Sequence, residues 1–117
     1  MILKQIKTLW EQFLVDQAPA ALPDFPEDIP CRWQVTFSGR VQNVGFRYEA
    51  MQMAQRLGLT GYCENLPEGD VLAEFQGPEN RIEFLISFLE SIPRIHIQQK
   101  IIRVLPVIPG ETGFAYR

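Results

Sequence analysis

The first quarter of the chain changes from a helical pattern of hydrophobic positions to a proline-rich one. Apolar residues recur at three- and four-residue intervals with polar residues between them, as at Ile6, Leu9 and Phe13. This spacing predicts an amphipathic helix over residues 1–17, which precedes the main domain as an additional N-terminal element. Four prolines within residues 18–30 fix the backbone and remove amide donors, which predicts an extended linker. An exposed apolar stripe is a liability, so the helix is expected to pack against the domain or to self-associate with a second copy.

The pattern from residue 31 onward begins with a strand and continues with a helix. Between residues 31 and 37 apolar and polar side chains alternate, which predicts a half-buried strand. A loop over residues 38–45 follows, and the apolar positions between 46 and 57 then return to helical spacing. Gly58 stands where a left-handed C-terminal cap belongs, so the helix is predicted to end there.

A hairpin and a second helix are predicted next. Residues 59–65 and 71–76 can each form a strand, and Pro67-Glu68-Gly69 between them supplies turn chemistry. The following helix is opened by Pro78, which is predicted in its first turn, and it is ended by Pro93. The hairpin therefore separates two strand-to-helix units.

The last part of the chain completes the predicted fold. Residues 94–104 begin with alternation, but the apolar phase slips after Gln99, which predicts a strand with a β-bulge. Residues 114–117 could add a short edge strand. The order β-α-β-β-α-β, with right-handed crossovers, predicts a ferredoxin-like two-layer α+β sandwich over residues 31–117. Its mixed sheet is expected to carry both helices on one face, while the other face, which includes Arg32, is predicted to be solvated.

Composition and charge limit the class of function. The 117 residues are 46% hydrophobic, which is enough for one domain core but not for two. With 11 basic against 14 acidic residues the net charge is −3, so no general attraction to nucleic acid or to an anionic membrane is expected. No apolar run is long enough to span a membrane, and Lys4 and Lys7 interrupt any secretory signal, so a cytoplasmic location is predicted. Cys31, Cys63 and the single His96 match no metal-site spacing, so neither a metal nor a cofactor is expected.

The loop over residues 38–47 carries the candidate chemistry. A strand-to-helix connection points unpaired backbone amides and the positive end of the helix dipole into one concavity. Gly39 and Gly45 let the backbone curl, and Asn43 is the non-glycine residue most tolerant of a left-handed conformation. Such a loop is typical of an anion-binding nest, to which Arg47 adds a charged fork matched to phosphate oxygens. The alternative is a glycine pair that only shapes a turn, beside a solvated arginine.

This loop resembles the signature of the acylphosphatase family, Gly-x-Val-Gln-Gly-Val-x-Phe-Arg, and differs from it only at Asn43. The resemblance extends through most of residues 31–117, while residues 1–30 lie outside it. The further matching residues include Leu57-Gly58-Leu59, Gly61-Tyr62-Cys63-Glu64-Asn65 and Phe114-Ala115-Tyr116-Arg117. A match this long and in this order is specific.

The resemblance implies an enzyme that hydrolyses carboxyl-phosphate bonds of small-molecule acyl phosphates by direct water attack, without metal, cofactor or covalent intermediate. It implies that Arg47 binds the phosphate and that Asn65 holds the attacking water. The implied phosphate-binding loop comprises Arg40, Val41, Gln42, Asn43, Val44, Gly45 and Phe46. The strand pattern independently places Asn65 at a strand end, where it can reach the mouth of the loop, although an asparagine that only starts a turn fits there equally well.

Two departures from the family pattern and two alternative functions accompany this interpretation. Asn43 replaces a glycine, and a backbone angle reserved for glycine would strain the loop by about 1–2 kcal/mol. Glu64 is acidic where the family usually has a basic or neutral residue, but alternation places it on the face opposite Asn65. A non-catalytic anion- or partner-binding module of the same fold is one alternative. RNA binding, the other, requires aromatic side chains on the open face of the sheet, where the pattern places polar residues.

Overall fold

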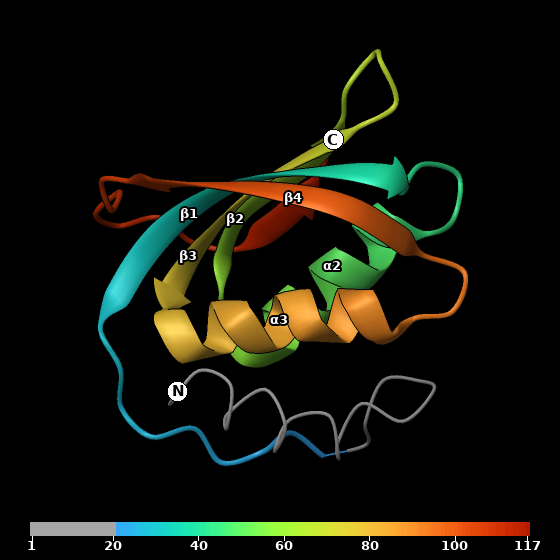
Figure 1. The fold of residues 1–117 in the computed structure, drawn as a ribbon. Coiled ribbons are helices and arrows are strands. Elements are labelled where there is room, and N and C mark those ends of the chain that lie inside the picture. Colours follow the sequence, from blue (N-terminus) through green and yellow to red (C-terminus); the bar gives the residue numbers. More distant parts are fainter. Residues whose placement is uncertain (1–20) are drawn as a thin grey trace.

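One mixed sheet and two helices make up residues 21–117, the part of the chain that the computed structural model describes (Figure 1). The elements in chain order are β1 (Pro30–Arg40), α2 (Phe46–Leu57), β2 (Thr60–Asn65), β3 (Val71–Pro78), α3 (Glu79–Ser91), β4 (His96–Leu105) and β5 (Phe114–Tyr116). This order confirms the predicted ferredoxin-like α+β sandwich. The amphipathic helix predicted over residues 1–17 lies outside the described residues. The expectation that it packs against the domain or self-associates therefore stays a prediction.

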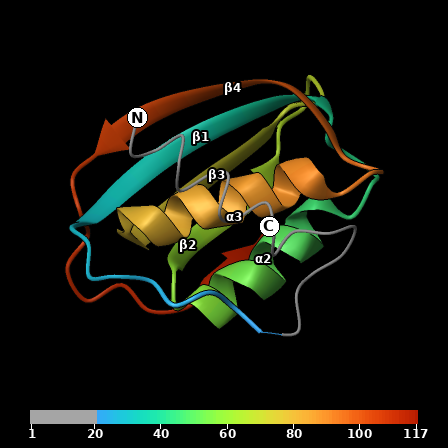
Figure 2. The same cartoon turned by 60° about the horizontal axis from the view of Figure 1, so that its bottom comes forward.

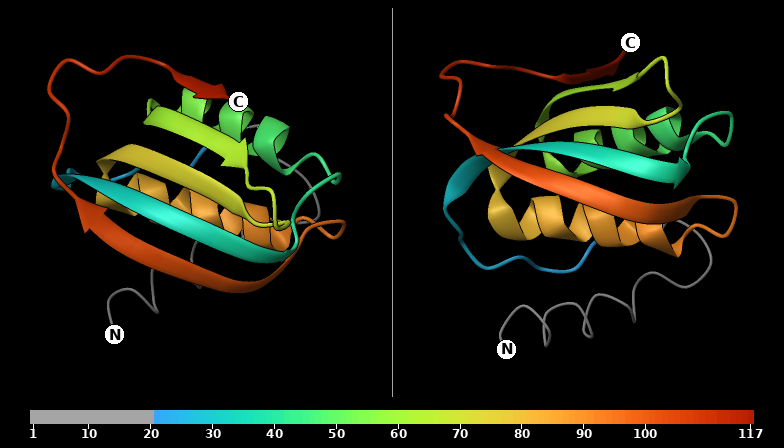
Figure 3. Two further views of the ribbon diagram at one scale, coloured as in Figure 1. Left: turned by 90° about the horizontal axis from the view of Figure 1, so that it is seen from above. Right: turned by 45° about the horizontal axis from the view of Figure 1, so that its top comes forward.

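The sheet has the strand order β4-β1-β3-β2-β5. The left panel of Figure 3 views it from the face that carries no helix. β1 is antiparallel to both of its neighbours, β3 and β4, and β2 is antiparallel to β3. β5 pairs in parallel with β2 at the far edge, which confirms the predicted short edge strand. Because β4 and β5 form opposite edges, residues 106–113 must cross the sheet to join them.

The hydrophobic core lies between the sheet and the helices, on the face that alternation predicted. Val35, Phe37 and Phe75 of the central strands are fully buried there. From α2, the Phe46 ring packs against that of Phe37, with 4.9 Å between the ring centroids. α2 ends as predicted, since Gly58 takes left-handed angles (φ 70°, ψ 21°) and caps the last turn. No helix in the described part of the chain has the length and apolar character needed to cross a membrane.

β4 contains the predicted bulge, one residue earlier than the apolar pattern indicates. Successive residues of β1 pair with Gln99 and Ile97, so Gln98 is the extra residue. Gly39 of β1 stands beside it with a φ of 121°, and a Cβ atom there would lie 2.3 Å from the carbonyl oxygen of His96. Only glycine allows the two strands to approach this closely. The bulge lies next to the loop that follows β1.

Arg32 contradicts the prediction of a fully solvated open face, because only 2% of it is exposed. Its Nε donates to Oε1 of Glu74 at 2.8 Å and its Nη1 to Oε1 of Glu111 at 2.8 Å. Gln76 exchanges hydrogen bonds with the main chain of Ile108, which holds the 106–113 segment over this end of the face. The open face is therefore covered here by a segment that is remote in sequence.

Arg32, Glu74, Gln76 and Glu111 form what we call the Arg32 cluster. Burial alone would raise the pKa of both carboxyl groups. Hydrogen bonds from Arg32, supported by Tyr62 at Glu74 and by Thr60 at Glu111, outweigh burial and hold each pKa below its usual value. The cluster therefore keeps both carboxylates ionised as hydrogen-bond acceptors.

The segment before β1, residues 22–28, packs against the helices although it lies inside the predicted linker. Figure 2 shows this segment, in blue, passing beside the helices on its way to β1. Phe25 meets Phe84 of α3 edge-on, with 5.4 Å between ring centroids. Oδ2 of Asp28 accepts a hydrogen bond from the main-chain amide of Asn80 at 2.9 Å. Asp28 therefore caps the first turn of α3 from outside the helix. We call this segment the strap.

Candidate active site

Buried side chains hold both ends of the loop between β1 and α2. Val41 and Phe46 are 1% and 2% exposed, respectively. Between them Asn43 and Gly45 take left-handed angles, with φ of 61° and 79°. The first value lies in the region that asparagine tolerates, so the backbone requires no glycine at Asn43. The first amides of an α-helix have no carbonyl partner inside the helix, so a loop with two left-handed residues that leads into α2 is suited to bind an anion.

The outer side of the loop is tied to two other parts of the fold. Arg94, in the connection from α3 to β4, donates from Nε to the carbonyl oxygen of Val44 at 2.7 Å and forms an ion pair with Glu49 of α2. On the other flank, Nε2 of Gln42 donates to the carbonyl oxygen of Leu66 at 2.8 Å, just beyond β2. These bonds fix the position of the loop relative to α2 and to the end of β2.

Arg47, the second residue of α2, is positioned by the C-terminal part of the sheet. Its Nη1 donates to the main-chain oxygen of Arg117 at 2.6 Å. Its guanidinium lies 5.2 Å from the centroid of the Tyr116 ring, within the range of a cation–π contact. No Asp or Glu among the described residues forms an ion pair with Arg47. The guanidinium therefore keeps donors available for an anion.

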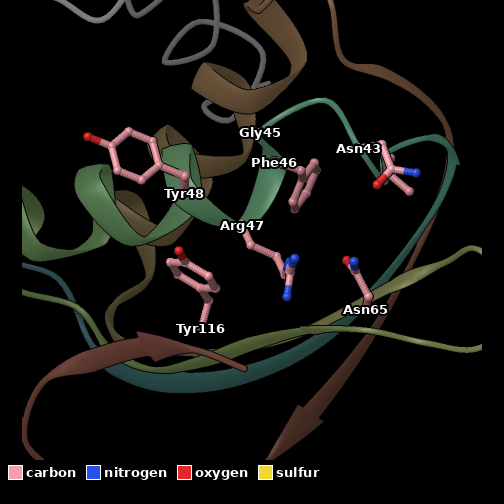
Figure 4. A pocket seen from close by; sticks show the side chains of 8 residues that line it. Asn43, Gly45, Phe46, Arg47, Tyr48, Asn65 and Tyr116 are labelled. Carbon is pink, nitrogen blue, oxygen red and sulfur yellow. The ribbon is translucent and has the colours of Figure 1, made fainter.

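Asn65, the last residue of β2, faces Arg47 across a pocket (Figure 4). Its side-chain oxygen Oδ1 is buried and has no hydrogen-bond partner among the described residues. A buried acceptor without a partner is costly unless water or a ligand satisfies it. The pocket has a volume of about 230 Å³ and is lined by Val41, Asn43, Gly45, Phe46, Arg47, Tyr48, Asn65 and Tyr116.

The structure brings together most of the residues proposed from the sequence. Both Arg47 and Asn65 line the pocket, as do four of the loop residues, whereas Arg40, Gln42 and Val44 are not among its lining residues. Arg40 is exposed at the end of β1. The two tyrosines were not predicted from the sequence. The sequence features that could have indicated them are the position of Tyr48 directly after Arg47 and the place of Tyr116 in the C-terminal segment that matches the family.

Neither Cys63 nor His96 provides a nucleophile in the pocket. Burial raises the pKa of the Cys63 thiol to about 12, although the charge of Arg47 acts in the opposite direction. The thiol is therefore neutral near pH 7 and packs as an apolar group. His96 is exposed at the start of β4, as expected. Within residues 21–117 no three His, Cys, Asp or Glu side chains gather in a way that could hold a metal ion.

Comparison with known proteins places this chain in a family. A sequence model of the acylphosphatase family matches residues 33–116. The chain belongs to the acylphosphatase family. An acylphosphatase of Clostridium beijerinckii is 39% identical over 90 residues, which cover 74% of this chain and 97% of that protein. One of Trichormus variabilis is 38% identical over 89 residues, covering 76% of this chain and 88% of that protein.

A solved acylphosphatase structure shows the same arrangement of elements. The structure of an acylphosphatase from Coxiella burnetii aligns with a TM-score of 0.67 and 30% sequence identity. The alignment covers 75% of this chain and 93% of that one. Family membership confirms the resemblance found in the loop, and the loop, Arg47 and Asn65 all lie within the matched region.

Proposed function

We propose that this protein is an acylphosphatase, which hydrolyses the carboxyl-phosphate bond of small acyl phosphates by direct attack of water on phosphorus. The observation that carries the proposal is that Arg47, four residues of the loop and Asn65 line one pocket, and that Oδ1 of Asn65 has no partner among the described residues. Family membership supports the same activity. Water would supply an oxygen to phosphorus, the bond from phosphorus to the carboxyl oxygen would break, and the products would be a carboxylate and phosphate.

The substrate makes modest demands on the protein. Its leaving group is a carboxylate whose conjugate acid has a pKa of about 4, so departure needs no general acid. What remains is to position the phosphoryl group and to neutralise charge on its oxygens, which are the terms that dominate phosphoryl transfer. The nest amides and Arg47 supply both, because they are held in place before the substrate arrives.

Asn65 is the residue proposed to orient the attacking water. A water that donates one hydrogen to Oδ1 keeps a lone pair free to point toward phosphorus. The hydrogen bonds from Gln42 to the carbonyls of Leu66 and Asp70 set the distance between this residue and the phosphate loop. Water placement and phosphate binding are thus coupled through the backbone.

The decisive experiment is a steady-state assay with benzoyl phosphate in the presence of a chelator. We expect Arg47→Ala to lower kcat/KM by at least about 10³-fold and Asn65→Ala by about 10²-fold, with no chelator effect. Asn43→Gly is expected to leave the rate unchanged or slightly higher, because the angle at Asn43 suits either residue. Arg103→Ala removes an exposed arginine of β4 and serves as the control.

A folded wild-type protein that turns over no acyl phosphate would exclude the proposed activity. It would favour the non-catalytic binding module of the same fold. Full activity of both Arg47→Ala and Asn65→Ala would move the chemistry to another site.

A further inference from the structure

Two tyrosines, Tyr48 and Tyr116, border the pocket without a direct role in the proposed phosphate binding or water placement. Tyr48 is 53% exposed and Tyr116 is 45% exposed, yet both line the same pocket as Arg47 and Asn65. No other Phe, Tyr or Trp within residues 21–117 is exposed to this degree. The two most exposed aromatic rings of the described chain therefore border the candidate active site.

Their position relative to the attacking water suggests what they contact. In-line displacement places the entering water and the departing group on opposite sides of phosphorus. In Figure 4 Arg47 lies between Asn65 on one side and the two tyrosines on the other. With water on the side of Asn65, the acyl group of the substrate leaves on the side of Tyr48 and Tyr116.

We propose that Tyr48 and Tyr116 form the seat of the acyl group and select substrates whose acyl group is aromatic. This inference rests on the proposed hydrolysis, since it names the substrate class of the same site. A flat ring can stack on an exposed tyrosine or meet it edge-on, and each such contact changes affinity by roughly 2- to 12-fold. A methyl group, as in acetyl phosphate, has too little surface to gain the same contact.

The two tyrosines differ in what else they hold. The ring of Tyr116 lies beneath Arg47, so its removal would also disturb the phosphate-binding guanidinium. Tyr48, by contrast, is not the ring that lies under Arg47, and because it is exposed its ring can be removed without loss of core packing. Tyr48 is therefore the position at which acyl selectivity can be tested apart from phosphate binding.

The test compares kcat/KM for benzoyl phosphate and for acetyl phosphate in wild type, Tyr48→Phe and Tyr48→Ala. We expect Tyr48→Ala to lower the value for benzoyl phosphate by about 5- to 10-fold and that for acetyl phosphate by less than about twofold. Tyr48→Phe, which keeps the ring, should retain the wild-type ratio. The inhibition constant of inorganic phosphate should stay unchanged in both variants. Val104→Ala, which truncates an exposed apolar side chain on β4, is the matched control.

An equal fall for both substrates, or no change for either, would overturn the acyl seat while leaving hydrolysis intact. Absence of turnover in wild type would instead count against the proposed function. In that event the affinities of benzoylphosphonate and acetylphosphonate, which cannot be hydrolysed at phosphorus, still decide the question by calorimetry. A preference for the benzoyl compound that Tyr48→Ala removes supports the seat, and equal affinities refute it.

Discussion

Two arginines of this chain lie in opposite electrostatic surroundings. Arg32 is buried and its guanidinium meets the carboxylates of Glu74 and Glu111, whose pKa values it lowers. Arg47 is half-buried, and among the described residues it meets a main-chain oxygen and the Tyr116 ring but no Asp or Glu. The first arginine is neutralised and joins parts of the fold. The second has no Asp or Glu partner among the described residues, so guanidinium donors remain that could bind a phosphate dianion.

The largest effect should come from giving Arg47 the surroundings of Arg32. Asn65→Asp would place a carboxylate across the pocket, where it would repel the phosphoryl group and compete for the guanidinium. We expect kcat/KM for benzoyl phosphate to fall by about 10³-fold and phosphate inhibition to weaken, with partial recovery of activity in acid as the new carboxyl group protonates. Gln98→Glu adds the same charge at the exposed bulge and should change little. An active Asn65→Asp enzyme would contradict the contrast between the two arginines.

The next largest effect is on stability. Arg32→Met would leave two partly buried carboxylates without their cation, and removing one partner of a buried ion pair typically costs about 3 kcal/mol. We expect the free energy of unfolding in urea to fall by about this amount, while kcat of the folded protein stays near wild type. The control is Arg103→Met, a loss of charge at an exposed site, which should cost less than about 0.5 kcal/mol. A variant that is stable but inactive would assign Arg32 to the active site.

A smaller effect is expected from loosening the outer side of the loop. Arg94→Ala removes the bond to the Val44 carbonyl and the ion pair with Glu49, so the nest amides lose their fixed direction. We expect kcat/KM to fall by about 10-fold, and the inhibition constant of phosphate to rise in parallel. Arg94→Lys can replace only one of the two contacts and should recover part of the loss. Unchanged phosphate inhibition would show that the nest holds its shape without Arg94.

The smallest expected effect is on the stability of the folded protein at acidic pH. Glu74 and Glu111 have lowered pKa values in the folded protein, so their contribution to stability is present above the unfolded pKa of about 4.3 and is lost as pH falls below it. The urea midpoint of wild type should therefore drop between about pH 6 and about pH 3, and that of Arg32→Met should drop less over the same range. Parallel pH profiles would show that the cluster does not account for acid sensitivity.

Local patterns of the sequence were sufficient for most of the fold. Alternation and helical spacing located the strands and helices, and Gly58 marked the end of α2 because a left-handed cap is a local requirement. The loop from β1 to α2 could also be predicted as an anion-binding loop. Glycine, asparagine and arginine have conformational and chemical preferences that do not depend on distant residues. Arg47 and Asn65 were found by their match to a family motif, and the structure places both at one pocket.

Contacts between distant segments were not predictable in this way. Arg32 occupies a polar position of an alternating strand, yet Glu111 of the crossing segment 106–113 contacts it over the open face. The hydrogen bond from Arg47 to Arg117 joins residues 70 positions apart, and no local sequence pattern predicts it. The same holds for Tyr116, whose position under the guanidinium follows from the parallel pairing of β5 with β2. Periodicity describes which face a residue takes, but not what covers that face.

The strap packs against α3 from outside the segment that matches the family model. The family match begins at residue 33, whereas Phe25 and Asp28 lie upstream of it. A protein shortened to the matched boundaries would expose the Phe84 ring and leave the first amides of α3 without an acceptor. A domain boundary placed at the start of the family match would therefore leave out the contacts that the strap makes with this helix.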